Sequence, residues 1–234
     1  MMQDATHYVG HRMLEAMHEA VQYSEAIFQK LQDAMPPAAR NVLDFGAGDG
    51  LFVDKFLAEG RKVDVVEPDL RLRDHLRGRS GETFGDVRDA ADQRYDFVYT
   101  VNVLEHIDAL DATCADLFRV LAPNATLFVF VPAFELLWTR LDDEACHVRR
   151  FTRGSLISAL ERSGFIVERA EFFDSLGFPA ALAVRMLEKL NLFSYGGGTV
   201  GFYDRYLFPI SRRLDLLTGK FVGKNLIAIA RRPA

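Results

Sequence analysis

The chain has 234 residues, of which 49% are hydrophobic, and a formal net charge of −5 at pH 7. This size and composition are typical of one α/β domain with a sizeable core, and the acidic balance disfavours a nucleic-acid partner. The longest nearly continuous apolar run, residues 176–184, is too short to cross a bilayer. Two cysteines without metal-like spacing and the lack of a signal-peptide pattern at the start favour a cytoplasmic location.

Residues 8–35 carry apolar side chains at alternating spacings of three and four, which predicts a helix with one apolar stripe. Leu14, Met17, Phe28 and Leu31 belong to this stripe. Pro36 and Pro37 end it. We therefore interpret residues 1–37 as an N-terminal capping helix that packs on the rest of a single domain, residues 1–234.

From residue 41 onward, short apolar strands alternate with helices. We expect strands at residues 41–45, 61–68, 82–86, 95–102, 125–132, 165–173 and 224–232. Helices are expected at residues 50–59, 70–77 and 111–121, and one more starts at the N-cap Thr152 and stops at Gly164. Such alternation is typical of a parallel sheet that is covered by helices on both faces, although the last two strands break the pattern.

Residues 174–223 form a helical, aromatic-rich insert before the last strand. Three interpretations compete for it: ordinary core, a lid over the site, and contact with a membrane surface. The spacing of Phe202, Tyr203, Tyr206, Leu207 and Ile210 favours a buried helix face, so core is the first choice. A lid that hinges at Gly196–Gly198 comes second, and membrane contact third.

The stretch "NVLDFGAGDGLF", residues 41–52, places three glycines directly after the first strand. Without Cβ atoms, Gly46, Gly48 and Gly50 can take positive φ and let a ligand lie on the main chain, at the edge where parallel sheets bind ligands. A mononucleotide P-loop needs Lys-Ser/Thr after the last glycine, but Leu51 and Phe52 stand there. A dinucleotide turn would need glycine at the position of Leu51, which weakens that alternative.

Acidic residues follow the next two strands. Glu67, at the end of the second strand, is placed to accept both hydroxyls of an adenosine ribose. Asp86 and Val87, after the third strand, are placed to hold an adenine amino group and ring. These residues predict an adenosine-containing ligand without saying which one.

In combination, the motifs resemble the class I S-adenosylmethionine-dependent methyltransferases. The resemblance covers nearly the whole chain in order: "QYSEAIFQKL", "VLDFGAGDGLF", "VVEPD", "GDVRD", "YDFVYTVNVLEHI", "LFRVLAPNATLFVFVP", "HVRRFT" and "NLIAIARRP". It implies a Rossmann-like α/β fold with a seven-stranded, mostly parallel sheet and an antiparallel last strand. It also implies S-adenosyl-L-methionine as cofactor, and an enzyme that transfers a methyl group.

The resemblance assigns the cofactor to residues after the first, second, third and fourth strands, with an aromatic residue of the N-terminal helix closing over its amino-acid end. The implied cofactor-binding residues are Tyr23, Asp44, Phe45, Gly46, Ala47, Gly48, Gly50, Glu67, Pro68, Asp86, Val87, Asn102, Val103 and Leu104. Carboxylates at Asp44 and Asp49 suit a cationic sulfonium and would repel a pyrophosphate.

Methyl transfer is an in-line displacement, so positioning supplies much of the rate and a base is needed only where the acceptor must lose a proton. His106 and His147 are the candidates for touching the acceptor, with structural roles as the alternative. Arg149 and Arg150 are candidates for holding an anionic group of the acceptor. Related enzymes with "ExxEH" here can hold a metal ion, but Asn102 replaces the first acid, so we expect none.

We therefore expect a small-molecule methyl acceptor, anionic or partly apolar, with oxygen, nitrogen and carbon all open as the methylated atom. The oligomeric state is not indicated by the sequence. Two other functions compete with this hypothesis. One is a protein that binds the cofactor without catalysis, as a sensor or scaffold, and the other is a nicotinamide-dependent oxidoreductase, which Asp49 and Leu51 disfavour.

Overall fold

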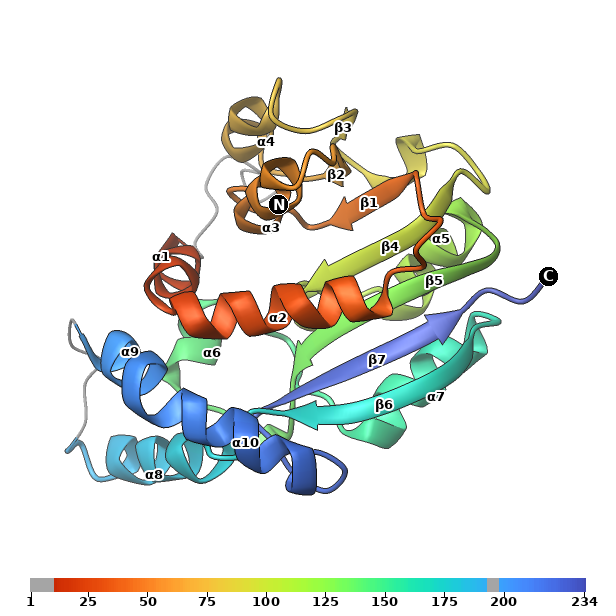
Figure 1. Cartoon of the computed structure of the whole chain (residues 1–234). Helices are drawn as coiled ribbons and strands as arrows, with labels where there is room; N and C mark the ends of the chain where they lie inside the picture. The colour runs from red at the N-terminus through yellow and green to blue at the C-terminus, as the bar shows by residue number, and fades with distance from the viewer. Residues whose placement is uncertain (1–10, 193–197) are drawn as a thin grey trace, which may run out of the picture.

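The computed structural model describes residues 11–192 and 198–234 and contains one seven-stranded sheet with strand order β3-β2-β1-β4-β5-β7-β6 (Figure 1). The strands are β1 (Val42–Phe45), β2 (Asp64–Val66), β3 (Thr83–Phe84), β4 (Tyr95–Val101), β5 (Leu121–Pro132), β6 (Ile166–Phe173) and β7 (Asn225–Arg231). Neighbours from β3 to β5 pair in parallel, whereas β7 runs antiparallel to both β5 and β6. The predicted seven-stranded fold with an antiparallel last strand is confirmed.

Four helices between the strands begin and end close to the predicted positions: α3 (Leu51–Ala58), α4 (Leu70–Leu76), α5 (Leu110–Val120) and α7 (Arg153–Arg162). The short helix α6 (Arg140–Glu144) has no counterpart among the predicted helices. Thr152 caps α7, because its hydroxyl accepts a hydrogen bond from the Ser155 amide at 3.1 Å, and Gly164 follows the helix with φ +97°. The strand expected at 125–132 is longer than predicted, since β5 begins at Leu121.

Two separate hydrophobic clusters cover the two faces of the sheet. On one face, Phe28 of α2 (Val21–Ala34), Phe56 of α3 and Phe97 of β4 belong to one cluster. On the other face, Leu117 of α5 packs against Val98 of β4 in a cluster that also takes in α7. Because successive strand residues point to opposite faces, the neighbouring residues Phe97 and Val98 serve different cores. The sheet is therefore buried on both sides, as its apolar strands predict.

The N-terminal segment differs from the single helix predicted at 8–35. It forms α1 (His11–Glu19) and α2 (Val21–Ala34), which are interrupted at Ala20, and residues 8–10 lie outside the described part. Within residues 11–192 and 198–234, none of the helices combines the length and apolar character needed to cross a membrane.

The insert contains α8 (Gly177–Lys189), α9 (Thr199–Phe202), a π-helical turn (Tyr203–Leu207) and α10 (Phe208–Thr218). The prediction that its aromatic stripe is buried is wrong: Phe202, Tyr206 and Ile210 are 59%, 54% and 50% exposed. The opposite side of this helix faces the protein, because Asp204 and Ser211 are buried there and make hydrogen bonds. Of the predicted hinge, Gly196 and Gly197 lie outside the described residues.

The insert also completes the first turn of α2. Ala20, at the N-cap of α2, has no side chain that can cap the helix. The buried Asp204 carboxylate instead accepts hydrogen bonds from the amides of Gln22, at 3.0 Å, and Tyr23, at 2.8 Å. Two of the four unpaired donors of the helix start are therefore satisfied by a residue that is distant in sequence.

We predict that Asp204→Ala lowers the free energy of unfolding by about 1–3 kcal/mol, because it leaves the buried amide of Tyr23 and the partly buried amide of Gln22 without an acceptor. Asp204→Asn, which keeps one acceptor oxygen, is expected to cost less. Urea denaturation followed by circular dichroism measures both. The matched control is Asp33→Ala near the exposed end of the same helix, and an equal loss in this control would contradict the prediction.

Candidate active site

A cavity of 870 Å³ opens where the carboxyl ends of β1, β2 and β4 meet. Its walls come from the segments that follow these strands, from the start of α5, and from Ala145, Cys146 and His147 after α6. Met13, Leu14 and Met17 of α1 complete it. Helices α3 and α5, which follow β1 and β4, pack on opposite faces of the sheet, so the two connections separate and leave this space.

The glycine turn after β1 lies along one wall of the cavity. Gly46, Gly48 and Gly50 have φ values of +84°, +57° and +91°, which residues other than glycine rarely adopt. A Cβ atom at Gly46 would also clash with the Val103 side chain after β4. The turn is therefore bare both because of its backbone conformation and because the β4 connection packs against it.

The Glu67 carboxylate connects this turn to the end of β2. Its two oxygens accept hydrogen bonds from the amides of Gly48, at 2.8 Å, and Asp69, at 2.9 Å. The side chain is buried, and burial raises the pKa of its carboxyl. Glu67 lines the cavity and is held by two backbone donors, so it can present its remaining lone pairs to a ligand.

Asp44, the third residue of β1, places a second buried carboxyl in the cavity wall. Burial raises the pKa of Asp44 to about 8, against the effect of the neighbouring Tyr99 hydroxyl. A cationic ligand would favour its ionised form. Asp49, in the turn, also lines the cavity, but its carboxylate is paired with His18 at 2.7 Å.

Most of the other predicted cofactor residues also line the cavity. They are Phe45, Ala47, Pro68, Asp86, Val87, Asn102 and Val103. Asp86 is paired with the Arg88 guanidinium, which lowers the pKa of its carboxyl. Two of the predicted residues are not among the lining residues: Leu104, which is fully buried, and Gly50, which is the N-cap of α3.

Tyr23 does not reach the cavity, contrary to the sequence-based interpretation. The centroid of its ring lies 5.3 Å from that of Phe173, and its hydroxyl donates a hydrogen bond to Oδ1 of Asn225 at 2.7 Å. The residues that cover the cavity from this side come from α1, one helix earlier in the chain. The stripe that includes Leu14 and Met17 signalled a packing surface, but nothing in it distinguished a core from a cavity wall.

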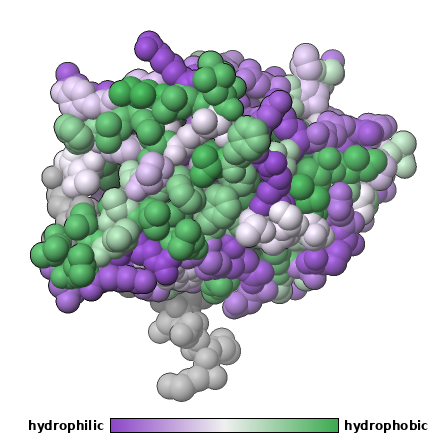
Figure 2. All heavy atoms as spheres, turned by 90° about the horizontal axis from the view of Figure 1, so that it is seen from below, coloured by the Kyte–Doolittle hydropathy of each residue, from purple (hydrophilic) through white to green (hydrophobic). Residues whose placement is uncertain are grey.

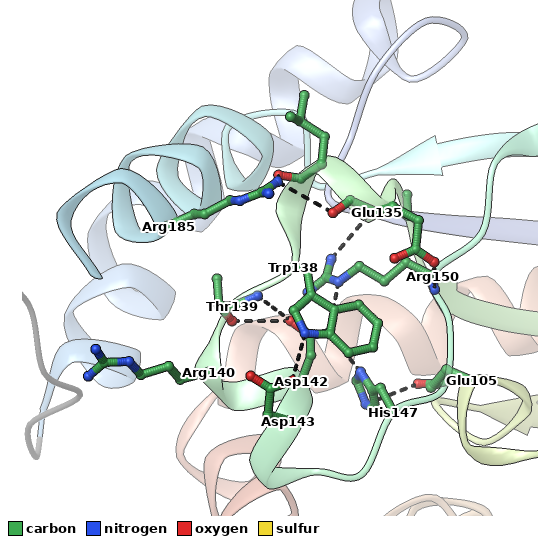
Figure 3. A network of polar contacts seen from close by, with 12 residues as sticks. Glu105, Glu135, Trp138, Thr139, Arg140, Asp142, Asp143, His147, Arg150 and Arg185 are labelled. Atoms are coloured by element: carbon green, nitrogen blue, oxygen red, sulfur yellow. Dashed lines mark hydrogen bonds and ion pairs between the residues drawn. The ribbon is translucent and has the colours of Figure 1, made fainter. Parts of the chain in front are cut away.

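His106 and His147 lie together on the cavity wall, with their ring centroids 4.7 Å apart. Burial, together with the nearby His147, lowers the pKa of His106 to about 4. Nδ1 of His147 lies 2.7 Å from Oδ1 of Asp142 (Figure 3). A carboxylate only accepts hydrogen bonds, so this contact places the ring proton on Nδ1 and leaves the lone pair on Nε2.

Asp142, which the sequence analysis did not single out, is the centre of this network. Arg150 donates to it from Nε at 2.8 Å and from Nη2 at 3.0 Å, and the Thr139 amide donates at 2.8 Å (Figure 3). Burial acts to raise the pKa of Asp142, but the hydrogen bonds from His147 and Arg150 hold it well below its usual range. Asp142 therefore stays ionised and holds the His147 ring in place.

The predicted acceptor-binding arginines have other partners. Besides Asp142, Arg150 donates to the Ala133 carbonyl at 3.1 Å, and Arg149 donates to the Asp108 carbonyl at 3.1 Å. Neither is among the residues that line the cavity. The geometry thus gives Arg150 a role in fixing Asp142 and lends no support to an acceptor-binding role for either arginine.

Glu105 is fully buried behind the two histidines, and neither of its carboxyl oxygens has a hydrogen-bond partner. Its Oε1 lies 4.0 Å from Nε2 of His147, and burial raises the pKa of Glu105 to about 8. Ligand atoms of Glu105, His106 and His147 all lie within 4.8 Å of one another. The expectation that this place holds no metal stays a prediction.

Two features are typical of the class I methyltransferase fold. One is the strand order, and the other is a glycine turn after β1 whose Gly48 amide donates a hydrogen bond to the Glu67 carboxylate. Residues 14–170 match the family model described as a methyltransferase domain. The chain belongs to this family of S-adenosylmethionine-dependent methyltransferases. The cofactor fits the site, because Glu67 and Asp44 offer buried carboxylates beside a main chain without Cβ atoms.

Individual relatives agree with this assignment. A curated protein of Mycolicibacterium smegmatis, described as a probable S-adenosylmethionine-dependent methyltransferase, is 28% identical over 162 residues, which cover 65% of this chain and 60% of that protein. The chain thus spans less than two thirds of the relative. A chain from a complex that contains the Haloferax volcanii Trm112 methyltransferase activator is 12% identical with a TM-score of 0.66, and both chains are covered completely. An Archaeoglobus fulgidus methyltransferase that depends on S-adenosylmethionine is 19% identical with a TM-score of 0.59, and 88% and 93% of the two chains are covered.

We predict that Glu105→Gln stabilises the protein more at pH 8 than at pH 5. The folded-state pKa of about 8 lies above the ordinary value of 4.5, so the folded protein holds a proton that the unfolded chain releases. The free energy of unfolding of the natural protein therefore falls as the pH rises from about 4.5 to 8, and glutamine removes this loss. Urea denaturation at both pH values should show that at pH 8 the free energy of unfolding of the variant exceeds that of the natural protein by at least about 1 kcal/mol. The control is Glu161→Gln on the exposed side of α7, and a pH-independent difference for Glu105→Gln would contradict the prediction.

Proposed function

We propose that this protein transfers a methyl group from S-adenosylmethionine to a small-molecule acceptor that is bound in the same cavity. The observation that carries the proposal is that the glycine turn, braced by Glu67, and the His147 ring, held from behind by Asp142, line one cavity. When bound, the cofactor supplies a methyl carbon that is activated by a positively charged sulfur. The residues of the chain then have to hold it, exclude water and position the acceptor.

Two carboxylates are assigned to the cofactor. Glu67 would accept hydrogen bonds from the ribose hydroxyls, because it is fixed by two backbone amides and turned to the cavity. Asp44 would lie beside the positive charge, which lowers its raised pKa and so favours the ionised form. Asp86 and Val87, at the start of the turn after β3, are left for the adenine.

His147 is the residue proposed to touch the acceptor. Asp142 keeps the proton on Nδ1, so Nε2 is the atom that can accept a proton from a hydroxyl or amine. His106 lies beside it as a polar wall, and burial keeps it neutral at pH 7. Asp142 and Arg150 act as positioning residues, because they reach the reaction only through the imidazole of His147.

Size and charge support a small molecule as the acceptor. A volume of 870 Å³ lies in the range of cavities that bind small molecules. The net charge of −5 disfavours nucleic acid as the acceptor. The chain is proposed to work in the cytoplasm, which suits its free cysteines Cys114 and Cys146.

We predict that Glu67→Gln weakens binding of S-adenosylmethionine at least about tenfold, because the amide loses charge and one acceptor oxygen. Isothermal titration calorimetry with this compound and its demethylated product measures the effect. Tyr23→Phe is the matched control and should bind within about twofold of the natural protein, since Tyr23 lies outside the cavity. The assignment would be rejected if the natural protein bound neither compound, or bound NADH in their place.

We also predict that His147→Gln lowers methyl transfer by about 100-fold while cofactor binding changes little. Radiolabelled cofactor and a low-molecular-weight cell extract provide the assay, and His75→Gln on exposed α4 is the control. Asp142→Asn should lower kcat more than it raises KM and should also alter the pH profile. The asparagine amide can donate a hydrogen bond to Nδ1 of His147, so the ring proton is no longer kept on Nδ1 and can move to Nε2. Cofactor binding without transfer to any extract component would favour a sensor or scaffold.

A further inference from the structure

Exposed large hydrophobic residues are concentrated in the insert. Of the 18 large hydrophobic residues that are exposed in the described structure, 12 lie between residues 186 and 221. Leu217 and Phe221 are each 76% exposed. Because soluble proteins rarely gather apolar side chains in one exposed patch, this concentration marks a docking surface.

These side chains share one side of their helices. Ile210, Leu214 and Leu217 follow one another at spacings of four and three in α10, and Phe221 lies just beyond its end. Met186 and Leu190 are spaced by four at the end of α8. Both helices lie at the bottom of the molecule in Figure 1, and Figure 2 shows apolar side chains gathered over this end with hydrophilic ones around them. We call these six residues the apolar insert face.

Charge around the apolar insert face is positive, although the whole chain has a net charge of −5. Residues 174–223 contain six lysines and arginines against four acids. In the described part of this segment the acids are turned inward: three of them are buried, and Asp215 accepts hydrogen bonds from the amides of Asp174 and Ser175. The exposed cations are Lys189, Arg205, Arg212, Arg213 and Lys220.

This combination selects among possible occupants. A second copy of the chain would bring cations against cations, which opposes association. A membrane with anionic lipids matches both properties, because apolar side chains enter the boundary between headgroups and acyl chains while lysines and arginines bind the phosphates. Nothing in this match depends on methyl transfer.

We propose that the apolar insert face docks the protein on the surface of a membrane that contains anionic lipids. Leu217 and Phe221, together with Met186 and Leu190, enter the headgroup boundary. Arg213 and Lys220 lie beside this apolar surface and contact lipid phosphates. The protein is bound peripherally, since the helices of the insert rest on the membrane and do not cross it.

The test is flotation of the full-length protein with vesicles of phosphatidylcholine, alone or with about 30 mol % phosphatidylglycerol. Binding is expected only with phosphatidylglycerol, and it should fall in about 0.5 M NaCl, where surface charges are screened. Arg213→Glu and Lys220→Glu should each weaken binding at least about fivefold. Leu217→Ser combined with Phe221→Ser should weaken it at least as much.

Matched controls are Lys62→Glu and Leu70→Ser, which change an exposed cation and an exposed apolar residue outside the insert. Circular dichroism melts confirm that each variant folds. The proposal is overturned if the natural protein ignores anionic vesicles, binds phosphatidylcholine equally well, or responds as strongly to the control substitutions. It is also overturned if light scattering shows a dimer that Leu217→Ser converts to a monomer, because a second copy would then cover the face.

Discussion

The site depends on the way that β1 and β4 lie side by side while their following helices take opposite faces of the sheet. Parallel pairing aligns the two carboxyl ends, and the separate cores under α3 and α5 pull the connections apart. The contact between Gly46 and Val103 is where these connections still touch. The cavity is thus a consequence of topology, and the glycine turn, Glu67 and the histidines are fitted around it.

The buried carboxyl groups around the cavity fall into two kinds, those that are surrounded by hydrogen-bond donors and those that are not. Asp142 is surrounded by donors from Thr139, His147 and Arg150, so its burial is compensated. Asp44 and Glu105 have no such set, and burial raises their pKa to about 8. Groups that are left uncompensated at a cavity lower the stability of the empty protein, and at Asp44 a cationic ligand supplies the missing charge.

Local signals predicted the parts that depend on neighbouring residues. The positive φ values of the glycine turn and the cap of α7 by Thr152 follow from the residue types alone, and the seven-stranded sheet with its antiparallel last strand follows from the family resemblance. Tyr23, Arg150 and the stripe around Tyr206 were misjudged because their surroundings come from distant segments. Whether an amphipathic side meets core, cavity or solvent depends on the partner element, and a buried acid such as Asp204 outweighed the aromatic stripe in orienting its helix.

The cap supplied by Asp204 also bears on how the chain folds during synthesis. Gln22 and Asp204 are separated by 182 positions, so α2 is made early but lacks two hydrogen bonds at its start until residue 204 has left the ribosome. Closing so long a loop is slow compared with forming a local helix. Helix α2, although it is translated early, is therefore among the last helices to gain its full set of hydrogen bonds.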